Sequence, residues 1–292
     1  MEALAELLED ALGQPTDILS VESVHGGCIH EALKLTTGRG NFFAKRSSLR
    51  DRGLLEAEAR GLHALQGTQT IRTPTVIGCG TNASHTLLVL EWLDLSPLTE
   101  KSGALLGEQL ADLHLSPASQ QFGWDHDNFI GSTPQNNSPS EDWSDFFRDR
   151  RLLPQLEVAK RSHRTLPSPE PFLENLETFF AGEPFRPAPL HGDLWSGNAA
   201  EDSSGRPVVF DPAFYFGDPE TDLAFSRYFG GFPPSFYQRY HQKIPTRQGW
   251  KIRATLYNLY HVLNHLNLFG IQYLAEAARM IGELNSASKG GS

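Results

Sequence analysis

The chain has 292 residues, a composition typical of globular proteins, and 25 Lys and Arg against 35 Asp and Glu, a formal net charge of −10. This acidic balance argues against a nucleic-acid or membrane partner, because each would require a basic surface. No stretch approaches the roughly 18 consecutive apolar residues of a membrane span. The length favours two lobes, and two cysteines make no disulfide framework, so we expect a cytoplasmic protein.

The first predicted elements form a lobe built on strands. Residues 1–12 carry leucines at helical spacing among acidic residues, which predicts an amphipathic helix and not a signal peptide. Three strands are then predicted, over residues 18–24, 29–35 and 42–45. The first two are joined through Gly26 and Gly27. Adjacent glycines let the backbone approach an anionic ligand, although such a pair is also a common turn.

Lys45 ends the third predicted strand, and Glu58 lies in the helix that follows. Glu58 shares a helical face with Leu54, Leu55, Leu62 and Leu65. An unpaired carboxylate on that buried face would be costly, and Lys45 is the obvious partner. A purely structural ion pair would show the same pattern.

Strands are next predicted over residues 76–80 and 86–90, and the second leads into Glu91 and Leu93. From there the pattern becomes helical. The predicted helices cover residues 105–115, 143–156, 172–180, 250–268 and 271–284. Asp218 is expected to cap a further helix that begins at Pro219.

The most informative stretch is the loop that contains Asp193 and Asn198, with Asp211 thirteen residues further on. Asp211 follows a short apolar run and precedes Pro212, which places it at the end of a strand. This order matches the protein-kinase signature H-R-D-x-x-x-x-N followed by D-F-G. It predicts phosphoryl transfer from ATP, with Asp193 as the base and with Asn198 and Asp211 as Mg²⁺ ligands. A polar loop that closes a hairpin would also contain such residues.

The same order predicts the nucleotide-binding groups. A strand lysine and a helix glutamate position the α- and β-phosphates in kinases, and the chain that leaves the last strand of the small lobe contacts adenine. The residues predicted to bind ATP are Gly26, Gly27, Cys28, Lys45, Glu58, Glu91 and Leu93.

His261 and His265 are four residues apart and would share a helical face, as a zinc-binding pair does. No glutamate lies between them in an HExxH pattern, and no third ligand has suitable spacing. We therefore expect a packed, hydrogen-bonded pair.

Several motifs together resemble the fructosamine kinase (ketosamine-3-kinase) family over nearly the whole chain. They are HGDLWSGN up to Asn198, VFDPAFYFGDPETDLA over 209–224, FGWDHDNFIGSTPQNN over 122–137 and LNHLNLFG over 263–270. HGDxxxxN alone indicates only the broad group of aminoglycoside- and choline-kinase-like phosphotransferases. Trp195 and the motif over residues 122–137, called the FGW block below, are more specific to fructosamine kinases.

The resemblance implies an α+β, two-lobed protein-kinase-like fold. An N-terminal antiparallel sheet lobe with one key helix would occupy residues 1–92, a mostly helical lobe residues 93–285, and a disordered tail residues 286–292. The implied activity is ATP-dependent phosphorylation of the 3-hydroxyl of ketosamines, the sugar adducts that glycation leaves on lysine amines. The substrate would be a small ketosamine or a glycated protein, the role deglycation repair, and Trp195 would stack against the sugar or its lysine stem.

Two alternatives remain open. One is an aminoglycoside or other amino-sugar kinase of the same fold, and the other is a pseudokinase that binds nucleotide. The FGW block weighs against the amino-sugar kinase. The pseudokinase is disfavoured because all five polar side chains of the predicted site are present, namely Lys45, Glu58, Asp193, Asn198 and Asp211. The resemblance also associates Cys28 with redox-sensitive disulfides between chains, which implies a monomer or a redox-dependent homodimer. A loop cysteine that stays reduced is the alternative.

Overall fold

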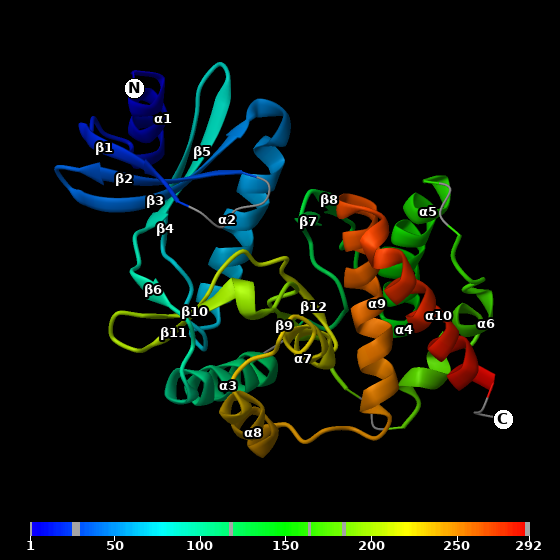
Figure 1. Cartoon of the computed structure of the whole chain (residues 1–292). Helices are drawn as coiled ribbons and strands as arrows, with labels where there is room; N and C mark the ends of the chain where they lie inside the picture. The colour runs from blue at the N-terminus through cyan, green and yellow to red at the C-terminus, as the bar shows by residue number, and fades with distance from the viewer. Residues whose placement is uncertain (1, 25–29, 117–118, 163–164, 183–184, 290–292) are drawn as a thin grey trace.

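A five-stranded antiparallel sheet in the order β1-β2-β3-β5-β4 forms the N-terminal part of the chain (Figure 1). The structure is a computed structural model and describes residues 2–24, 30–116, 119–162, 165–182 and 185–289. The strands of the sheet are β1 (Ile18–Ser23), β2 (Glu31–Thr37), β3 (Gly40–Ser48), β4 (Val76–Thr81) and β5 (His85–Glu91). Residue 92, where we predict the lobe boundary, directly follows the end of β5.

Each face of this sheet is covered by one helix, and the alternation of side chains along β5 explains how. Leu87 and Val89 point to one face and join the leucines of the first helix, whereas Leu88 and Leu90 point to the other and pack on the second. These helices are α1 (Glu2–Leu12) and α2 (Arg52–Gly67). β5 lies between two helices and is therefore buried on both faces. This burial fixes the position of β5 and of β3, which pairs with it.

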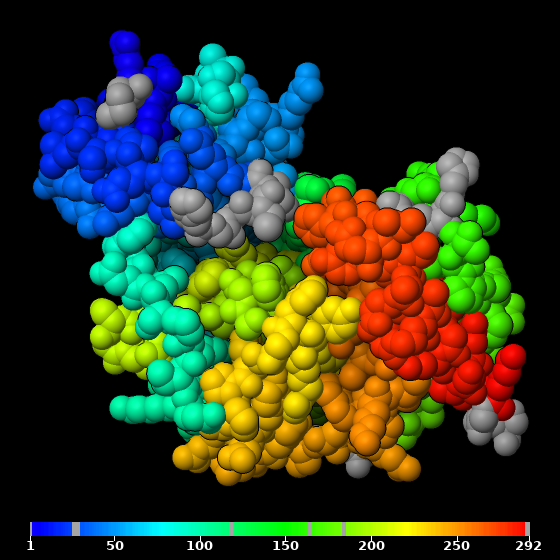
Figure 2. All heavy atoms as spheres, viewed as in Figure 1, coloured from blue at the N-terminus to red at the C-terminus, as the bar shows by residue number. Residues whose placement is uncertain are grey.

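The rest of the chain is mostly helical and lies below and beside the sheet in Figure 1. Its helices are α3 (Glu100–Leu115), α4 (Trp143–Phe147), α5 (Leu153–Arg161), α6 (Glu170–Leu173), α7 (Glu220–Ser226), α8 (Pro234–Lys243), α9 (Trp250–Phe269) and α10 (Leu274–Lys289). Its short strand pairs are β7 (Asn128–Ile130) with β8 (Thr133–Gln135) and β9 (Ala188–Leu190) with β12 (Tyr215–Gly217). In Figure 2, the N-terminal part (blue) stands above this helical part, and the yellow-green central segment is visible below it.

One arginine links the two parts, beside a small sheet that follows the end of β5. The sheet has the order β11-β10-β6, with β6 (Leu95–Ser96), β10 (Ala199–Asp202) and β11 (Pro207–Val209). Arg72 precedes β4, and its Nη1 lies 2.5 Å from Asp202 Oδ2, while its Nη2 lies 3.4 Å from Glu91 Oε1. The loop after α2, the end of β5 and the end of β10 are therefore held together.

The expected helix over 143–156 is interrupted. α4 ends at Phe147, residues Arg148–Leu152 form a π-helical turn, and α5 follows. Pro154 lacks an N–H and so cannot donate to the carbonyl of Arg150, and the buried Arg151 guanidinium donates to that carbonyl instead. A proline inside an apolar pattern thus changed the helix without ending it.

Other boundaries also differ from expectation. The helix expected at 105–115 begins at Glu100, where Thr99 and Ser102 form a capping box, and the helix expected at 172–180 is replaced by α6 and a 3₁₀ turn over Leu176–Phe180. The expected tail is wrong for residues 286–289, because α10 continues to Lys289. Among the described residues, no helix combines the length and the apolar character that crossing a membrane requires.

Two buried glycines let α8 lie close against α3. A Cβ added at Gly107 would come within 2.1 Å of the Phe236 carbonyl oxygen, and one at Gly103 would meet the ring of Pro233 at 3.0 Å. In contrast, a Cβ at Gly282 inside α10 would meet nothing within 4 Å.

We predict that Gly107→Ala lowers the free energy of unfolding by about 1–3 kcal/mol, because α8 must move away from α3. Gly282→Ala makes the same chemical change inside a helix and should raise it by up to about 1 kcal/mol through helix propensity. Urea denaturation of both variants measures the difference. Equal effects would contradict the close packing of α3 and α8.

Candidate active site

The loop between β9 and β10 carries the predicted base and is fixed through its backbone. Gly192 has φ of 80°, and a Cβ there would lie 2.1 Å from the carbonyl oxygen of Ala213, so only glycine fits. Asp222 in α7 accepts hydrogen bonds from the backbone N–H of His191 at 2.8 Å and of Gly192 at 2.9 Å. A buried carboxylate therefore sets the position of the loop just before Asp193.

His191 fixes the loop from inside. Its Nδ1 accepts from the N–H of Asp193 at 3.2 Å, so Nε2 carries the proton and donates to the carbonyl of Phe210 at 3.0 Å. Burial lowers the pKa of His191, which keeps the ring neutral. The imidazole thus connects the loop of Asp193 to the residue just before Asp211.

Asp193 and Asn198 face each other across this loop. Asn198 Nδ2 donates to the backbone oxygen of Asp193 and to its Oδ2, both at 2.9 Å. One carboxylate oxygen of Asp193 is thereby occupied, and the amide oxygen of Asn198 is directed away from it. The Asp193 side chain is 23% exposed, so Oδ1 remains accessible.

Lys45 brings the two parts of the chain together. Its Nζ donates to both Glu58 oxygens, at 2.8 and 2.9 Å, and to Asp211 Oδ1 at 2.5 Å. The predicted ion pair between β3 and α2 is confirmed, and Asp211 joins it from the helical part. Asp211 has φ of 57°, a strained conformation for a residue other than glycine, of the kind that clusters at functional sites.

The pKa values reflect this crowding of carboxylates. Burial, and then the neighbouring Asp211, raise the pKa of Asp193 to about 7. Burial likewise raises the pKa of Glu58 to about 7, against the opposing effect of Lys45. For Asp211, burial acts to raise the pKa, but the Lys45 ammonium, with smaller contributions from His191 and Glu58, holds it below its ordinary value. The site therefore has an excess of negative charge that a bound cation would relieve.

Asn198 and Asp211 carry the types of donor atom that a magnesium ion shared with phosphates takes. No group of three or more His, Cys, Asp or Glu side chains in the described ranges is arranged to hold a metal by itself. An amide and a carboxylate supply two oxygen ligands, which is the usual protein share when Mg²⁺ binds a nucleotide. The donor atoms here suit such a shared site.

The remaining predicted residues have different outcomes. Gly26, Gly27 and Cys28 lie outside the described residues. Glu91 and Leu93 lie where β5 leads towards β6, at the junction of the two parts. Trp195 packs edge-on against Phe229, with ring centroids 5.4 Å apart.

Sequence reasoning missed a polar cluster that holds the backbone just after Asp211. Asn128 Nδ2 donates to the carbonyl of Phe214 at 2.8 Å, and Gln135 Nε2 to Asn128 Oδ1 at 2.8 Å. Asn137 Nδ2 donates to the same Asn128 oxygen at 2.9 Å, and Tyr260 to Gln135 Oε1 at 2.7 Å. All three amide side chains belong to the FGW block. The sequence therefore showed the motif, but not that its amides hold the backbone after Asp211.

Two further expectations concern helices α7 and α9. Asp218 Oδ1 accepts from the N–H of Glu220 at 3.0 Å, but Pro219 is the N-cap, and Asp218 is also paired with Arg247. The histidine pair is packed as predicted, because His265 Nδ1 donates to the carbonyl of His261 at 2.7 Å. His261, however, also faces Asp193, which the sequence did not indicate.

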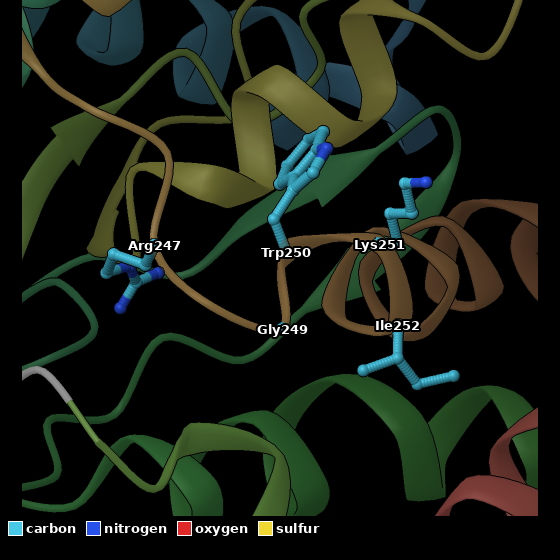
Figure 3. Close-up of a pocket in the computed structure, with 5 residues that line it drawn as sticks. All are labelled: Arg247, Gly249, Trp250, Lys251 and Ile252. Atoms are coloured by element: carbon cyan, nitrogen blue, oxygen red, sulfur yellow. The ribbon is translucent and has the colours of Figure 1, made fainter.

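A hollow of about 410 Å³ at the start of α9 is lined by none of the residues predicted for the active site. It is lined by Arg247, Gly249, Trp250, Lys251 and Ile252. In Figure 3 the side chains of Arg247, Trp250, Lys251 and Ile252 point in different directions and do not converge on a common point. We assign it no role.

Comparison with known proteins matches the chain to one family. A family model for fructosamine kinase matches residues 1–287. A probable ketoamine kinase of Synechocystis is 43% identical over 280 residues, covering 96% of this chain and 95% of its own. A chloroplastic protein-ribulosamine 3-kinase of Arabidopsis thaliana is 37% identical over 295 residues, covering 96% and 89%.

Solved structures agree on the fold. A putative fructosamine-3-kinase from Haemophilus somnus has a TM-score of 0.89 at 28% identity and covers 96% of both chains. A thermostable mutant of the aminoglycoside phosphotransferase APH(4)-Ia, solved with AMP-PNP and hygromycin B, has a TM-score of 0.61 at 18% identity, covering 94% of this chain and 95% of its own. The second likeness concerns the fold alone. The predicted α+β, two-lobed kinase-like fold is confirmed.

The ion cluster makes a prediction about stability. Lys45→Met leaves the buried Glu58 without its cation and should lower the free energy of unfolding by about 3–5 kcal/mol. The Asp211 contact contributes less, because that side chain is 43% exposed. The double variant Lys45→Met/Glu58→Gln removes both charges and should recover most of the loss. Chemical denaturation at pH 7 measures both, and a double variant as unstable as the single one would contradict the pairing.

Proposed function

Because the chain belongs to the fructosamine kinase family, we propose that it transfers the γ-phosphoryl group of ATP to the 3-hydroxyl of a ketosamine. The observation that carries this proposal is the meeting of Lys45, Glu58 and Asp211, from segments far apart in sequence, beside the loop of Asp193 and Asn198. We place the activity in the cytoplasm, as the sequence predicts.

Asp193 is proposed as the general base. Its Oδ2 is held by Asn198, so Oδ1 is the oxygen that would accept the proton of the attacking hydroxyl. A carboxyl group whose pKa is raised towards neutrality is a better proton acceptor than an ordinary aspartate. The same residue can be ionised at pH 8 and still take up a proton during the transfer.

Lys45, oriented by Glu58, would bind the α- and β-phosphates once the nucleotide displaces its contact with Asp211. Asn198 and Asp211 would hold Mg²⁺, which neutralises charge on the phosphates and aligns the transferred group. The backbone of Glu91 and Leu93 is proposed to contact adenine. Trp195, supported by Phe229, is proposed to contact the sugar or the stem of its amine.

The substrate class can be tested with a panel of acceptors. We expect ATP-dependent ADP release with fructosamine, ribulosamine or erythrulosamine derivatives of lysine and little with hygromycin B or other aminoglycosides. The panel also compares free ketosamines with glycated protein. Turnover of an aminoglycoside but of no ketosamine would favour the alternative, and ATP binding with no turnover at all would favour a pseudokinase.

The base assignment makes a second prediction. Asp193→Asn should lower kcat by about 10²–10⁴-fold while ATP affinity is retained. Wild-type kcat/KM should fall as the pH is lowered through about 7, because Asp193 becomes protonated and can no longer accept a proton. Near wild-type turnover of Asp193→Asn would show that another group is the base.

In contrast, Asp211→Ala should weaken Mg²⁺–ATP binding, measured by calorimetry.

A further inference from the structure

His261 is a buried side chain beside the proposed base, with a polar atom left free. It lies in the middle of α9 and is 2% exposed. Its Nδ1 has no hydrogen-bond partner within the part of the chain that the structure describes and lies 4.0 Å from Asp193 Oδ1. Buried polar atoms are rarely left unpaired, and those that are call for an explanation.

The ring of His261 is held firmly in this position. It stacks on Phe225 with 3.6 Å between ring centroids and 7° between planes, and its backbone carbonyl is bound by His265. Burial lowers the pKa of His261 well below its ordinary value, with His265 and Arg151 adding to the effect, so the ring is neutral. A neutral imidazole can donate or accept through Nδ1 according to its tautomer.

The acceptor hydroxyl must approach the free oxygen of Asp193. Asn198 occupies Oδ2, so the reacting hydroxyl would bind at Oδ1, which is the oxygen that His261 faces. A 4.0 Å separation is too long for a direct hydrogen bond between the two side chains. With the reacting hydroxyl bound at Asp193 Oδ1, His261 Nδ1 would instead lie next to a neighbouring group of the substrate.

We propose that His261 Nδ1 hydrogen-bonds the oxygen on a carbon adjacent to the phosphorylated one, and so selects acceptors with neighbouring oxygens. This inference rests on the proposed function. In a ketosamine the carbons on either side of C3 carry a carbonyl oxygen and a hydroxyl, and a neutral imidazole can bind either one. His261 would then be a specificity-determining residue supplied by α9.

Two substitutions at the same position separate recognition from packing. His261→Phe keeps an aromatic ring on Phe225 but removes the nitrogen, whereas His261→Asn places an amide near the site of Nδ1 and loses the stacking. We expect His261→Phe to lower kcat/KM for ketosamines about ten- to a hundredfold, with an unchanged KM for ATP and an unchanged or higher melting temperature. His261→Asn should retain activity within roughly threefold.

A purely structural role would reverse this order, because Asn would disturb the packing and Phe would not. His261→Gln moves the amide towards the position of Nε2 and serves as a second loss variant. Activity of His261→Phe and His261→Gln equal to wild type, or a greater loss with Asn than with Phe, would overturn the proposal.

Substrate analogues complete the test. A 4-deoxy ketosamine and one with C2 reduced each remove or alter one neighbouring oxygen. Wild-type kcat/KM should fall with at least one of them, and the same analogue should cause little further loss in His261→Phe. An additional loss as large as in wild type would overturn the proposal. A wild type that hydrolyses ATP but phosphorylates no ketosamine would refute the proposed function itself.

Discussion

The structure depends on one buried ammonium group. Lys45 of β3 binds Glu58 of α2 and Asp211 of the segment after β11, so a single cation links the sheet, its covering helix and the helical part of the chain. One positive charge faces two carboxylates, and Asp193 adds a third nearby. Such an arrangement is a poor way to gain stability, because desolvation offsets much of the attraction. It suits the magnesium ion and the ATP phosphates that we propose bind here.

Around this centre the protein uses buried polar groups to fix backbone. Asp222 holds the loop before Asp193, His191 connects that loop to Phe210, and the amides of the FGW block support the chain after Asp211. Each of these groups is paired, so burial strengthens the hydrogen bonds and favours one geometry. His261 is the contrast, since within the described ranges its Nδ1 has no hydrogen-bond partner, and it faces the Asp193 oxygen that Asn198 does not bind. Paired polar groups that fix the backbone, together with an unpaired nitrogen directed at the site, are the arrangement expected where a ligand binds.

The comparison with sequence reasoning shows where local patterns are reliable. The ion pair of Lys45 with Glu58 was predicted because a carboxylate on an apolar helical face requires a nearby cation. The helix over 143–156 was not predicted correctly, because the guanidinium of Arg151 replaces the donor that Pro154 lacks, and that contact cannot be seen in periodicity. The disordered tail was predicted to begin too early. Small polar residues such as those after Leu284 are typical of disordered chain ends, yet α10 continues to Lys289.

The sequence by itself determined the order of the chemistry: a strand lysine, a helix glutamate, a loop aspartate with an asparagine five residues later, and a strand-end aspartate, within motifs that indicate the family. Spacing along the chain carries such information because helix and strand periodicities are local. Only the tertiary structure decided that Asp211 reaches Lys45, that Asp222 anchors the loop and that His261 faces Asp193. The hydrogen bonds of Asp211 and Asp222 join residues that are 166 and 30 positions apart in the sequence. His261 and Asp193 are brought together by the packing of α9 alone.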